Sequence, residues 1–279
     1  MAGVGMGFLL QWNGLWVVAG CAGMLVVVSL LDDIFGLPVV WRLMTHGAVA
    51  AGFLGFTLGA DQGLIAVIVL FFAIVWMINL YNFMDGSDGL AGGMALIGFG
   101  FYAIAGYLHG EMGFATASAS IAASALAFLL FNFHPAKVFM GDAGSIPLGF
   151  LAAALGIMGW RDGVWPGWFP VMIFSPFILD ASLTLLKRLL RGEKVWQAHR
   201  EHYYQRVVQM GWGHRYTALI EYGLMIGVGV SAIGMLELSP LYQVVLAAFW
   251  LVFYATLMRM ADKHWVAFVR EQEIHANQH

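Results

Sequence analysis

The stretch around which the chain is organised reads Asn79-Leu80-Tyr81-Asn82-Phe83-Met84-Asp85-Gly86-Ser87-Asp88-Gly89-Leu90. It follows directly on the apolar run from Leu64 to Ile78, so two amides and two carboxylates stand where a hydrophobic segment ends. Ionisable side chains are costly within a bilayer and usually functional where they occur. The stretch therefore predicts a membrane span that ends at a cation-binding face.

The spacing within this stretch predicts a break in the helix. Asp85 and Asp88 are three residues apart and would be neighbours on a helix. Each three-residue step turns the side chain by about 60°, however, so Asn79 and Asp88 would face opposite ways on an unbroken helix. Gly86 and Gly89 allow the backbone to unwind and to approach a ligand. A single Asp-Gly pair would indicate only a helix end, but four polar groups within ten residues favour a functional site.

The composition is that of a membrane protein. Of the 279 residues, 61% are hydrophobic and 10% charged, and the mean hydropathy is +0.80. These values are typical of a polytopic helical membrane protein. The 35 glycines and 11 tryptophans suit close helix packing and the membrane interface. A net charge of -3 gives no reason to expect nucleic acid as a partner, and the single cysteine, Cys21, excludes an intrachain disulfide.

We therefore expect an all-α fold, a polytopic transmembrane helical bundle in which residues 1–279 form a single integral membrane domain. About nine apolar spans are predicted, at residues 8–31, 39–59, 63–82, 91–108, 113–132, 146–160, 168–188, 216–236 and 240–259. Several are near the ~20 residues needed to cross the hydrocarbon core, and the sixth is short enough to be tilted or half buried in protein.

The basic residues predict the orientation. If the loop after the first span is cytoplasmic, all but one of the 13 Lys and Arg residues lie inside or at the inner face, and only Arg161 lies outside. This distribution obeys the positive-inside rule. The same orientation puts three acidic groups on the cytoplasmic side: Asp32 with Asp33, Asp85 with Asp88, and Asp142. Two separate patterns thus indicate one cytoplasmic active-site face.

Two further inner loops carry acids that suit a hard cation. Asp32 and Asp33 are adjacent and do not share a helix face, so one can face a site while the other caps the helix or contacts solvent. Asp142 and Asp85 are oxygen donors of the kind that Mg²⁺ prefers, with water and substrate phosphates completing the coordination. The alternative is that Asp142 caps the next helix and Lys137 contacts lipid headgroups.

The fourth inner loop is the most basic. Many basic or imidazole side chains lie between residues 187 and 215, among them Lys187, Arg188, Arg191, Lys194, His199, Arg200, His202, Arg206 and Arg215. A loop that only faces anionic headgroups would have the same charge. The imidazoles at His199 and His202 also suit diphosphate and nucleobase contacts. Zinc is less favoured, because no third histidine or cysteine is close in sequence and the aspartates suit a harder ion.

A basic loop and acidic groups on one face indicate a phosphorylated substrate bridged by magnesium. Four segments, Asp32–Gly36, Asn79–Gly92, Pro135–Ser145 and Gly192–His202, resemble the polyprenyl-phosphate N-acetylhexosamine-1-phosphate transferases, glycosyltransferase family 4. This family includes the phospho-N-acetylmuramoyl-pentapeptide translocases. The segments occur in the family's order and at its spacing.

The resemblance implies transfer of a sugar-1-phosphate from a UDP-N-acetylhexosamine to undecaprenyl phosphate, with release of UMP. This reaction starts cell-envelope polysaccharide synthesis at the cytoplasmic side of the bacterial inner membrane.

The resemblance also implies residue roles. The metal ligands would be Asn82 and Asp142, with Mg²⁺ as the ion and Mn²⁺ as an alternative. The catalytic group would be Asp32, Asp33, Asp85 and Asp88. Asp85 and Asp88 lie around the nucleotide and diphosphate, and Asp32 or Asp33 faces the lipid phosphate. A base there is not compulsory, because a lipid phosphate is already mostly ionised near neutral pH. The substrate-binding side chains would be Asn79, Lys137, His199, Arg200 and His202.

Two departures from the family pattern qualify this reading. Family members usually carry two further helices before the acidic pair, so the chain is expected to lack them. The segment Gly192–His202, here called the histidine loop, lacks the three consecutive histidines expected in the muramoyl-pentapeptide enzymes. This favours simpler N-acetylhexosamines as substrates, as in O-antigen, enterobacterial common antigen or teichoic acid synthesis. Open alternatives are a phospho-N-acetylmuramoyl-pentapeptide transferase, a truncated non-catalytic relative and a membrane transporter. The lipid bilayer is an expected partner, and a homodimer is left open.

Overall fold

The computed structural model describes residues 14–58, 63–197 and 199–276. Residues 8–13 of the first expected span and residue 59 of the second lie outside these ranges. In chain order the helices are α2 (Leu15–Phe35), α3 (Val39–Thr57), α4 (Leu64–Phe83), α5 (Leu90–Leu108), α6 (Met112–Asn132), α7 (Gly141–Arg161), α8 (Trp168–Ile173), α9 (Ser175–Leu190), α10 (Tyr203–Val207), α11 (Gly213–Met235) and α12 (Pro240–Ala276). A π-helical turn, η1 (Val208–Trp212), joins α10 to α11.

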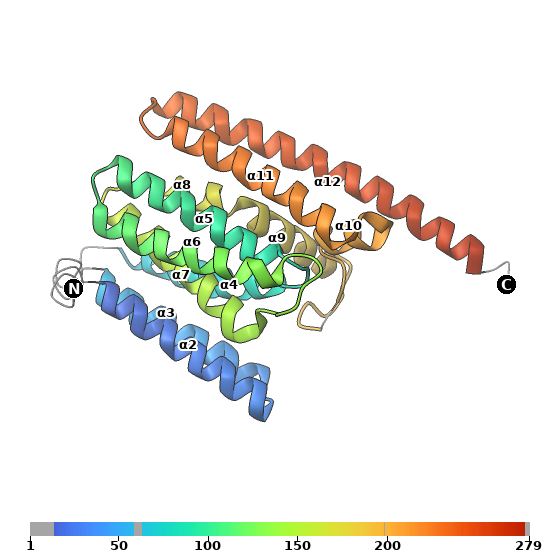
Figure 1. Cartoon of the computed structure of the whole chain (residues 1–279), viewed down its shortest axis with the longest axis horizontal. Coiled ribbons are helices and arrows are strands. Elements are labelled where there is room, and N and C mark those ends of the chain that lie inside the picture. Colours follow the sequence, from blue (N-terminus) through green and yellow to red (C-terminus); the bar gives the residue numbers. More distant parts are fainter. Residues whose placement is uncertain (1–13, 59–62, 198, 277–279) are drawn as a thin grey trace.

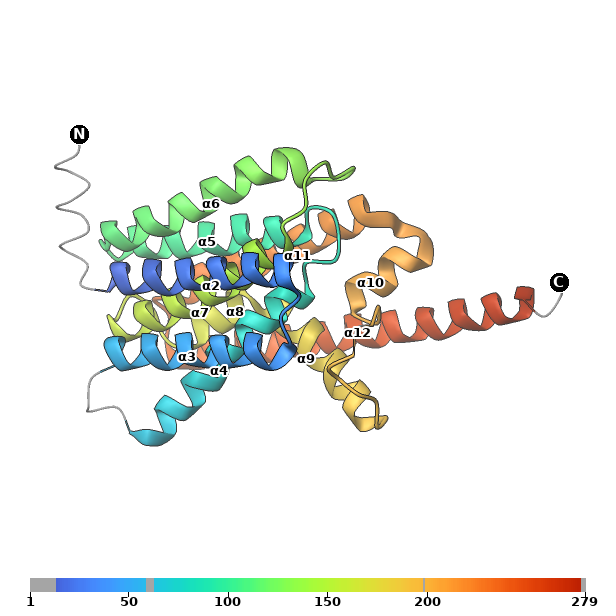
Figure 2. The ribbon, with the colours of Figure 1, turned by 90° about the horizontal axis from the view of Figure 1, so that it is seen from below.

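The helices run side by side in one bundle (Figure 1). α2 and α3 lie on one flank, α11 and α12 on the opposite flank, and the helices from α4 to α9 lie between them. Among the membrane-spanning helices α5 and α7 are the most enclosed. In their most apolar 18-residue stretches 61% and 67% of the residues are buried, against 17% in α12. The far half of α12 continues past the end of the bundle (Figure 2). Lipid would therefore contact mainly the outer helices.

Eight of the described helices are long and apolar enough to cross a membrane, which confirms the predicted polytopic helical bundle. The prediction of nine continuous spans is wrong, because residues 168–188 form two helices, α8 of six residues and α9 of 16. The helices meet at Phe174, directly before Ser175 and Pro176. Proline lacks an amide hydrogen and its ring clashes with the carbonyl four residues earlier, so a continuous helix is interrupted there.

The sixth span is also longer than expected. α7 begins at Gly141 rather than near residue 146 and has 21 residues, with Pro147 inside it. Gly141 adopts φ 61°, which glycine tolerates without a steric penalty. Asp142 then lies in the first turn, where the positive end of the helix dipole stabilises a carboxylate. Asp142 therefore belongs to a helix start and not to a loop.

α4 and α7 approach closely because the residue of α7 that faces α4 is a glycine. A Cβ at position 149 would lie 2.6 Å from the carbonyl oxygen of Met77 and 2.8 Å from the Cα of Ile78. These are backbone atoms, so a side chain at Gly149 would have to push the two helices apart. Gly149 thus sets the separation of the helices that carry Asn82 and Asp142.

Gly149→Ala should destabilise the protein, because overpacking a close helix contact typically costs about 1–3 kcal/mol. We expect a lower midpoint of thermal unfolding for the purified protein in detergent. Gly52→Ala on α3 is the matched control, since a Cβ there meets no described atom within 4 Å. Its unfolding midpoint should stay at or slightly above that of the wild type, because alanine favours helix. Equal midpoints for the two variants would contradict the close contact.

Candidate active site

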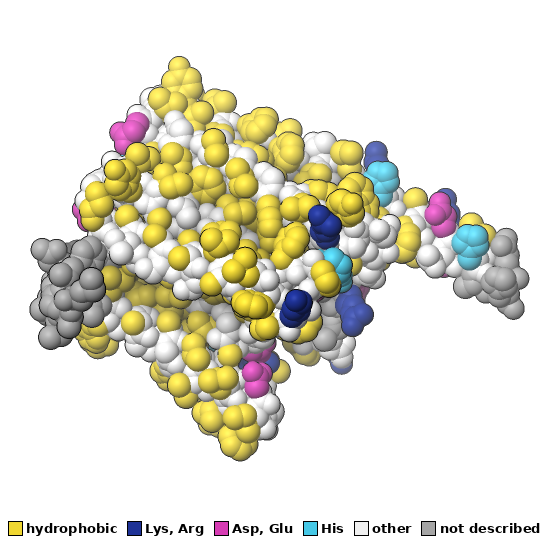
Figure 3. All heavy atoms as spheres, in the orientation of Figure 1, with side chains coloured by type: hydrophobic (Ala, Val, Ile, Leu, Met, Phe, Trp, Pro, Cys, Tyr) yellow, Lys and Arg dark blue, Asp and Glu magenta, His cyan; other side chains and the backbone are white. Residues whose placement is uncertain are grey.

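The site lies at the end of the bundle from which α12 projects. The carboxyl ends of α2, α4, α6 and α9 meet the amino ends of α3, α5 and α7 there (Figure 2). Hydrophobic side chains cover the flank of the bundle, whereas Lys, Arg and His side chains gather toward this end (Figure 3). Arg161, the basic residue expected on the opposite side, donates to the carbonyl of Thr57. Thr57 ends α3 at the other end of the bundle (Figure 2). The charged end predicted from the sequence therefore exists as one surface.

The polar turn after α4 is held open by glycine. α4 ends at Phe83 and α5 starts at Leu90, so the predicted break is confirmed. Gly89 adopts φ 77°, and its amide donates to Oδ1 of Asn132 over 3.0 Å. Gly86 has a different use, because a Cβ there would overlap the hydroxyl of Tyr204. The two glycines thus let the turn fold back and let α10 dock on it.

An arginine links the acids at the centre of the site. Arg42 of α3 lies 3.2 Å from Asp32 of α2 and donates to Asp142 of α7 over 2.6 Å. The amide of Asn82 on α4 donates to the other oxygen of Asp142 over 2.7 Å and contacts Ser145 at 3.0 Å. We call Asp32, Arg42, Asn82, Asp85 and Asp142 the acidic centre. Four helices and one turn contribute to it.

Asp85 completes the acidic centre from the turn after α4. Burial and the nearby charge of Asp142 raise the pKa of Asp85 to about 7, although the backbone amide of Gly141 stabilises its charged form. Near neutral pH, ionising Asp85 thus puts a second, buried negative charge near that of Asp142, at an energetic cost. A cation between them would remove this cost, and the arrangement therefore favours cation binding.

The donor set fits magnesium, with protein supplying only part of the coordination. In the described ranges, no group of three or more His, Cys, Asp or Glu side chains is arranged to hold a metal ion. Mg²⁺ is commonly held by one or two carboxylates, with waters and substrate phosphates as the other ligands. Asp142 and Asp85 provide such carboxylates, and the oxygen of the Asn82 amide can replace its nitrogen by a flip of the side chain.

The structure distinguishes the two members of the first acidic pair. Asp32 accepts the amide of Leu37 over 2.7 Å and pairs with Arg42, whereas Asp33 is exposed. One acid of the pair therefore faces the site, as the sequence predicts. Asn79 lies about one turn deeper on α4, where it donates to the carbonyl of Val75 and contacts His46 at 3.4 Å. Asn79 thus lies beneath the acidic centre, and its contacts are with the α3–α4 interface.

Asp88 has different partners from Asp85. It accepts hydrogen bonds from His134 over 2.7 Å and from the amide of Ala136 over 3.1 Å. Burial acts to raise the pKa of Asp88, but these hydrogen bonds outweigh it and the pKa is lowered. His134 in turn stacks on His214 at 5.8 Å. Asp85 and Asp88 therefore have different partners, and Asp88 holds the loop after α6.

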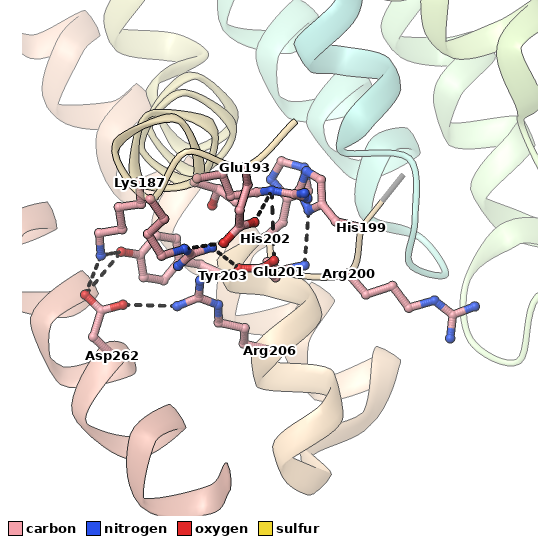
Figure 4. Close-up of polar contacts among 12 residues, drawn as sticks. Lys187, Glu193, His199, Arg200, Glu201, His202, Tyr203, Arg206 and Asp262 are labelled. Atoms are coloured by element: carbon pink, nitrogen blue, oxygen red, sulfur yellow. Dashed lines mark hydrogen bonds and ion pairs between the residues drawn. The ribbon is translucent and has the colours of Figure 1, made fainter. Parts of the chain in front are cut away.

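The histidine loop is docked against the end of α4. The buried His202 ring stacks on Phe83 with centroids 6.2 Å apart, and the hydroxyl of Tyr204 donates to the Phe83 carbonyl over 3.1 Å. His199 lies 4.8 Å from His202, ring to ring. Arg200 is exposed and points away from the other labelled side chains (Figure 4). Two of the three predicted side chains of this loop therefore lie together beside the turn.

His199 is neutral at physiological pH. Burial lowers its pKa to about 4, and the charges of His202 and Arg188 act in the same direction. A neutral imidazole donates or accepts a hydrogen bond but provides no positive charge for a diphosphate. Lys137, the other predicted cation, is exposed on the loop between α6 and α7. The positive charge nearest the acids is that of Arg42.

Sequence reasoning did not assign Arg42 and Asp180 to the site. Arg42 enters the sequence-based prediction only as a positive-inside residue, and its place beside Asp32 and Asp142 depends on the packing of α3. Asp180 is a single acid within the apolar segment 168–188, which is a recognised signal for function in a membrane span. It accepts the amides of Tyr203 and Tyr204, both over 2.9 Å, and so caps α10.

Comparisons with known proteins agree with the family that the sequence resembles. The model of glycosyl transferase family 4 matches residues 15–160. A probable undecaprenyl-phosphate N-acetylglucosaminyl 1-phosphate transferase of Bacillus subtilis is 29% identical over 76% of this chain and 63% of its own length. An undecaprenyl-phosphate alpha-N-acetylglucosaminyl 1-phosphate transferase of Yersinia pestis is 30% identical over 70% of this chain and 59% of its own.

A phospho-N-acetylmuramoyl-pentapeptide-transferase of Shouchella clausii is 34% identical over 63% of this chain and 55% of its own length. The chain thus spans between 55% and 63% of these relatives. The matched residues 15–160 contain the whole acidic centre, while the histidine loop follows them. A family model that matches more than half of the chain, together with these relatives, shows that the chain belongs to glycosyl transferase family 4.

Proposed function

We propose that the chain is a magnesium-dependent transferase that moves an N-acetylhexosamine-1-phosphate from a UDP-sugar to undecaprenyl phosphate and releases UMP. The observation that carries the proposal is the acidic centre: Asp32, Arg42, Asn82, Asp85 and Asp142 converge at one end of a membrane bundle. A lipid substrate reaches such a place from the bilayer and a nucleotide reaches it from water. The names of the relatives from Bacillus subtilis and Yersinia pestis describe this type of reaction.

The proposed reaction exchanges one diphosphate bond, to UMP, for another, to the lipid phosphate. An oxygen of the lipid phosphate attacks the phosphorus that bears the sugar, and the bond from this phosphorus to the oxygen of the UMP phosphate breaks. UMP leaves with that oxygen and the bonding electrons. When bound, Mg²⁺ neutralises charge on the phosphates. No base is needed for a nucleophile that is already ionised.

Arg42 and Asp32 have separate tasks in this proposal. A guanidinium matches the geometry of a phosphate and remains charged at any physiological pH. Arg42 is therefore the side chain proposed to bind the lipid phosphate. Asp32 keeps Arg42 oriented through its 3.2 Å contact. His199 and His202 provide hydrogen bonds on the nucleotide side, next to the turn that carries Asp85.

The site is proposed to face the cytoplasm from a bacterial inner membrane, and the distribution of Lys and Arg supports this through the positive-inside rule. For the sugar, the histidine loop has no run of three histidines, which favours a simple N-acetylhexosamine over muramoyl-pentapeptide. The Shouchella clausii relative is named a phospho-N-acetylmuramoyl-pentapeptide-transferase, so the muramoyl-pentapeptide donor is the competing candidate.

The direct test is transfer of radiolabel from UDP-N-acetylglucosamine to undecaprenyl phosphate in membranes that contain this 279-residue chain. We expect a labelled lipid product that requires magnesium. Asp142→Asn should reduce the product by at least about 10²-fold, because an electrostatic group of this kind supplies that order of rate enhancement. UDP-N-acetylmuramoyl-pentapeptide is the second donor to test. An absence of lipid product with both donors would contradict the proposal.

Asp85→Asn should make the protein less active but more stable at alkaline pH. The pKa of Asp85 rises from 3.8 to about 7 on folding, so the folded protein binds this proton more tightly and loses stability as pH rises through that window. An asparagine removes this loss. With magnesium chelated, the unfolding midpoint of the variant should exceed that of the wild type at pH 8, and the difference should be smaller at pH 5, where the wild type has lost only part of this stability.

Asp33→Asn is the control for this pH effect, because it removes an exposed acid at the same end of the molecule. Its midpoint should follow the wild type at both pH values. If Asp85→Asn behaves like this control, Asp85 does not face Asp142 as the structure indicates.

A further inference from the structure

Residues 191–197 and 199–202, between α9 and α10, form no helix or strand and carry His199 and His202. α10 has five residues and continues through η1, which is kinked at Gly211, into α11. A helix this short has no independent stability in water. The position of the two histidines therefore depends on the side chains that fasten α10 to its neighbours.

One attachment of α10 is to α9 and α4. Asp180 accepts the first two amides of α10 and lies 3.3 Å from Nδ1 of His202, and Tyr204 bonds to the Phe83 carbonyl. These contacts fix the amino end of α10. They leave its opposite side, which carries Arg206, to be held by another element.

That element is the part of α12 that continues past the bundle. Asp262 accepts hydrogen bonds from Lys187 of α9 over 2.5 Å and from Arg206 of α10 over 3.1 Å, and the hydroxyl of Tyr203 lies 3.4 Å away. Figure 4 shows Asp262 on one side of this group and the histidines on the other. The guanidinium of Arg206 also lies 5.2 Å from the ring centroid of Tyr203 and 5.7 Å from that of Trp265. One carboxylate thus joins three helices.

The two ion pairs of Asp262 differ in importance. The side chains of Lys187 and Asp262 are 37% and 34% exposed, and an ion pair of that kind contributes little. The side chain of Arg206 is only 6% exposed, and its other carboxylate neighbour, Glu201, lies 3.8 Å away. Its Nε is buried without a hydrogen-bond acceptor. Without Asp262, a buried guanidinium would lose its hydrogen-bonded carboxylate, which is far more costly than losing a surface pair.

We propose that Asp262 is a positioning residue: from the last helix it fixes Arg206, and through α10 it holds His199 and His202 beside the turn that carries Asp85. This inference rests on the proposed function for its kinetic consequence, because the histidines are assigned to the nucleotide side. It adds the extension of α12, which lies beyond the matched residues 15–160, to the apparatus that binds the UDP-sugar.

The kinetic test compares Asp262→Ala with Asp262→Glu in the full chain. We expect Asp262→Ala to raise the KM for UDP-N-acetylglucosamine by about tenfold or more, with little change in kcat or in the KM for undecaprenyl phosphate. A rise confined to KM reports weaker substrate binding, whereas misfolding lowers the active fraction and hence the apparent kcat. Asp262→Glu should restore the KM. Glu271→Ala, an exposed acid further along α12, is the matched control and should behave as wild type.

A second measurement needs no activity. Arg200 is exposed in the segment that precedes α10, so release of this segment should speed tryptic cleavage after Arg200 in the purified protein. We expect several-fold faster cleavage of Asp262→Ala than of wild type or Glu271→Ala. If the alanine variant does not fold, Asp262→Asn, which keeps the size of the side chain, is used in its place.

The two measurements separate the possible failures. If the wild-type protein shows no transfer activity, the proposed function is wrong. The cleavage rates would still decide whether Asp262 fixes the segment. Unchanged KM and cleavage rate in Asp262→Ala, or a fall in kcat alone, would overturn the positioning role.

Discussion

The hydrogen bond from Asn82 to Asp142, 2.7 Å long, depends on how closely α4 and α7 approach. Gly149 permits that approach, since a Cβ there would meet the backbone of α4 at Met77 and Ile78. The close packing extends along the two helices and ends where their polar residues meet. Small residues are the usual means by which membrane helices come this near. The position of the acidic centre is therefore a result of helix packing in the apolar part of the bundle.

Charge balance determines what the acidic centre can bind. Asp32, Asp85 and Asp142 are three acids with one arginine among them, and burial together with the charge of Asp142 raises the pKa of Asp85. A divalent cation would offset the excess negative charge. The same principle applies at α10, where buried Arg206 requires Asp262. In both places, pairing a charge that is shielded from water fixes the position of polar side chains.

The sequence was sufficient to predict the class of fold, because composition and hydropathy decide it. It also predicted the helix break at Gly86 and Gly89 and that one acid of the pair Asp32 and Asp33 can face inward while the other contacts solvent, without deciding which, since both follow from local spacing. It did not predict the break at Phe174, because an apolar run with prolines still reads as one span. The partners of Asp88 and the place of Arg42 depend on contacts between distant segments, which no local pattern contains. Asp262 was missed for the same reason.

The most direct test of the account is the binding of Mn²⁺, a paramagnetic ion that accepts the same oxygen ligands as Mg²⁺. Electron paramagnetic resonance would measure its affinity for the purified chain in the presence of UDP-N-acetylglucosamine. The account predicts that Asp142→Asn weakens binding by at least about tenfold, while Asp88→Asn, whose carboxylate holds His134, leaves it nearly unchanged. Equal affinity in Asp142→Asn and wild type would contradict a cation site at the acidic centre.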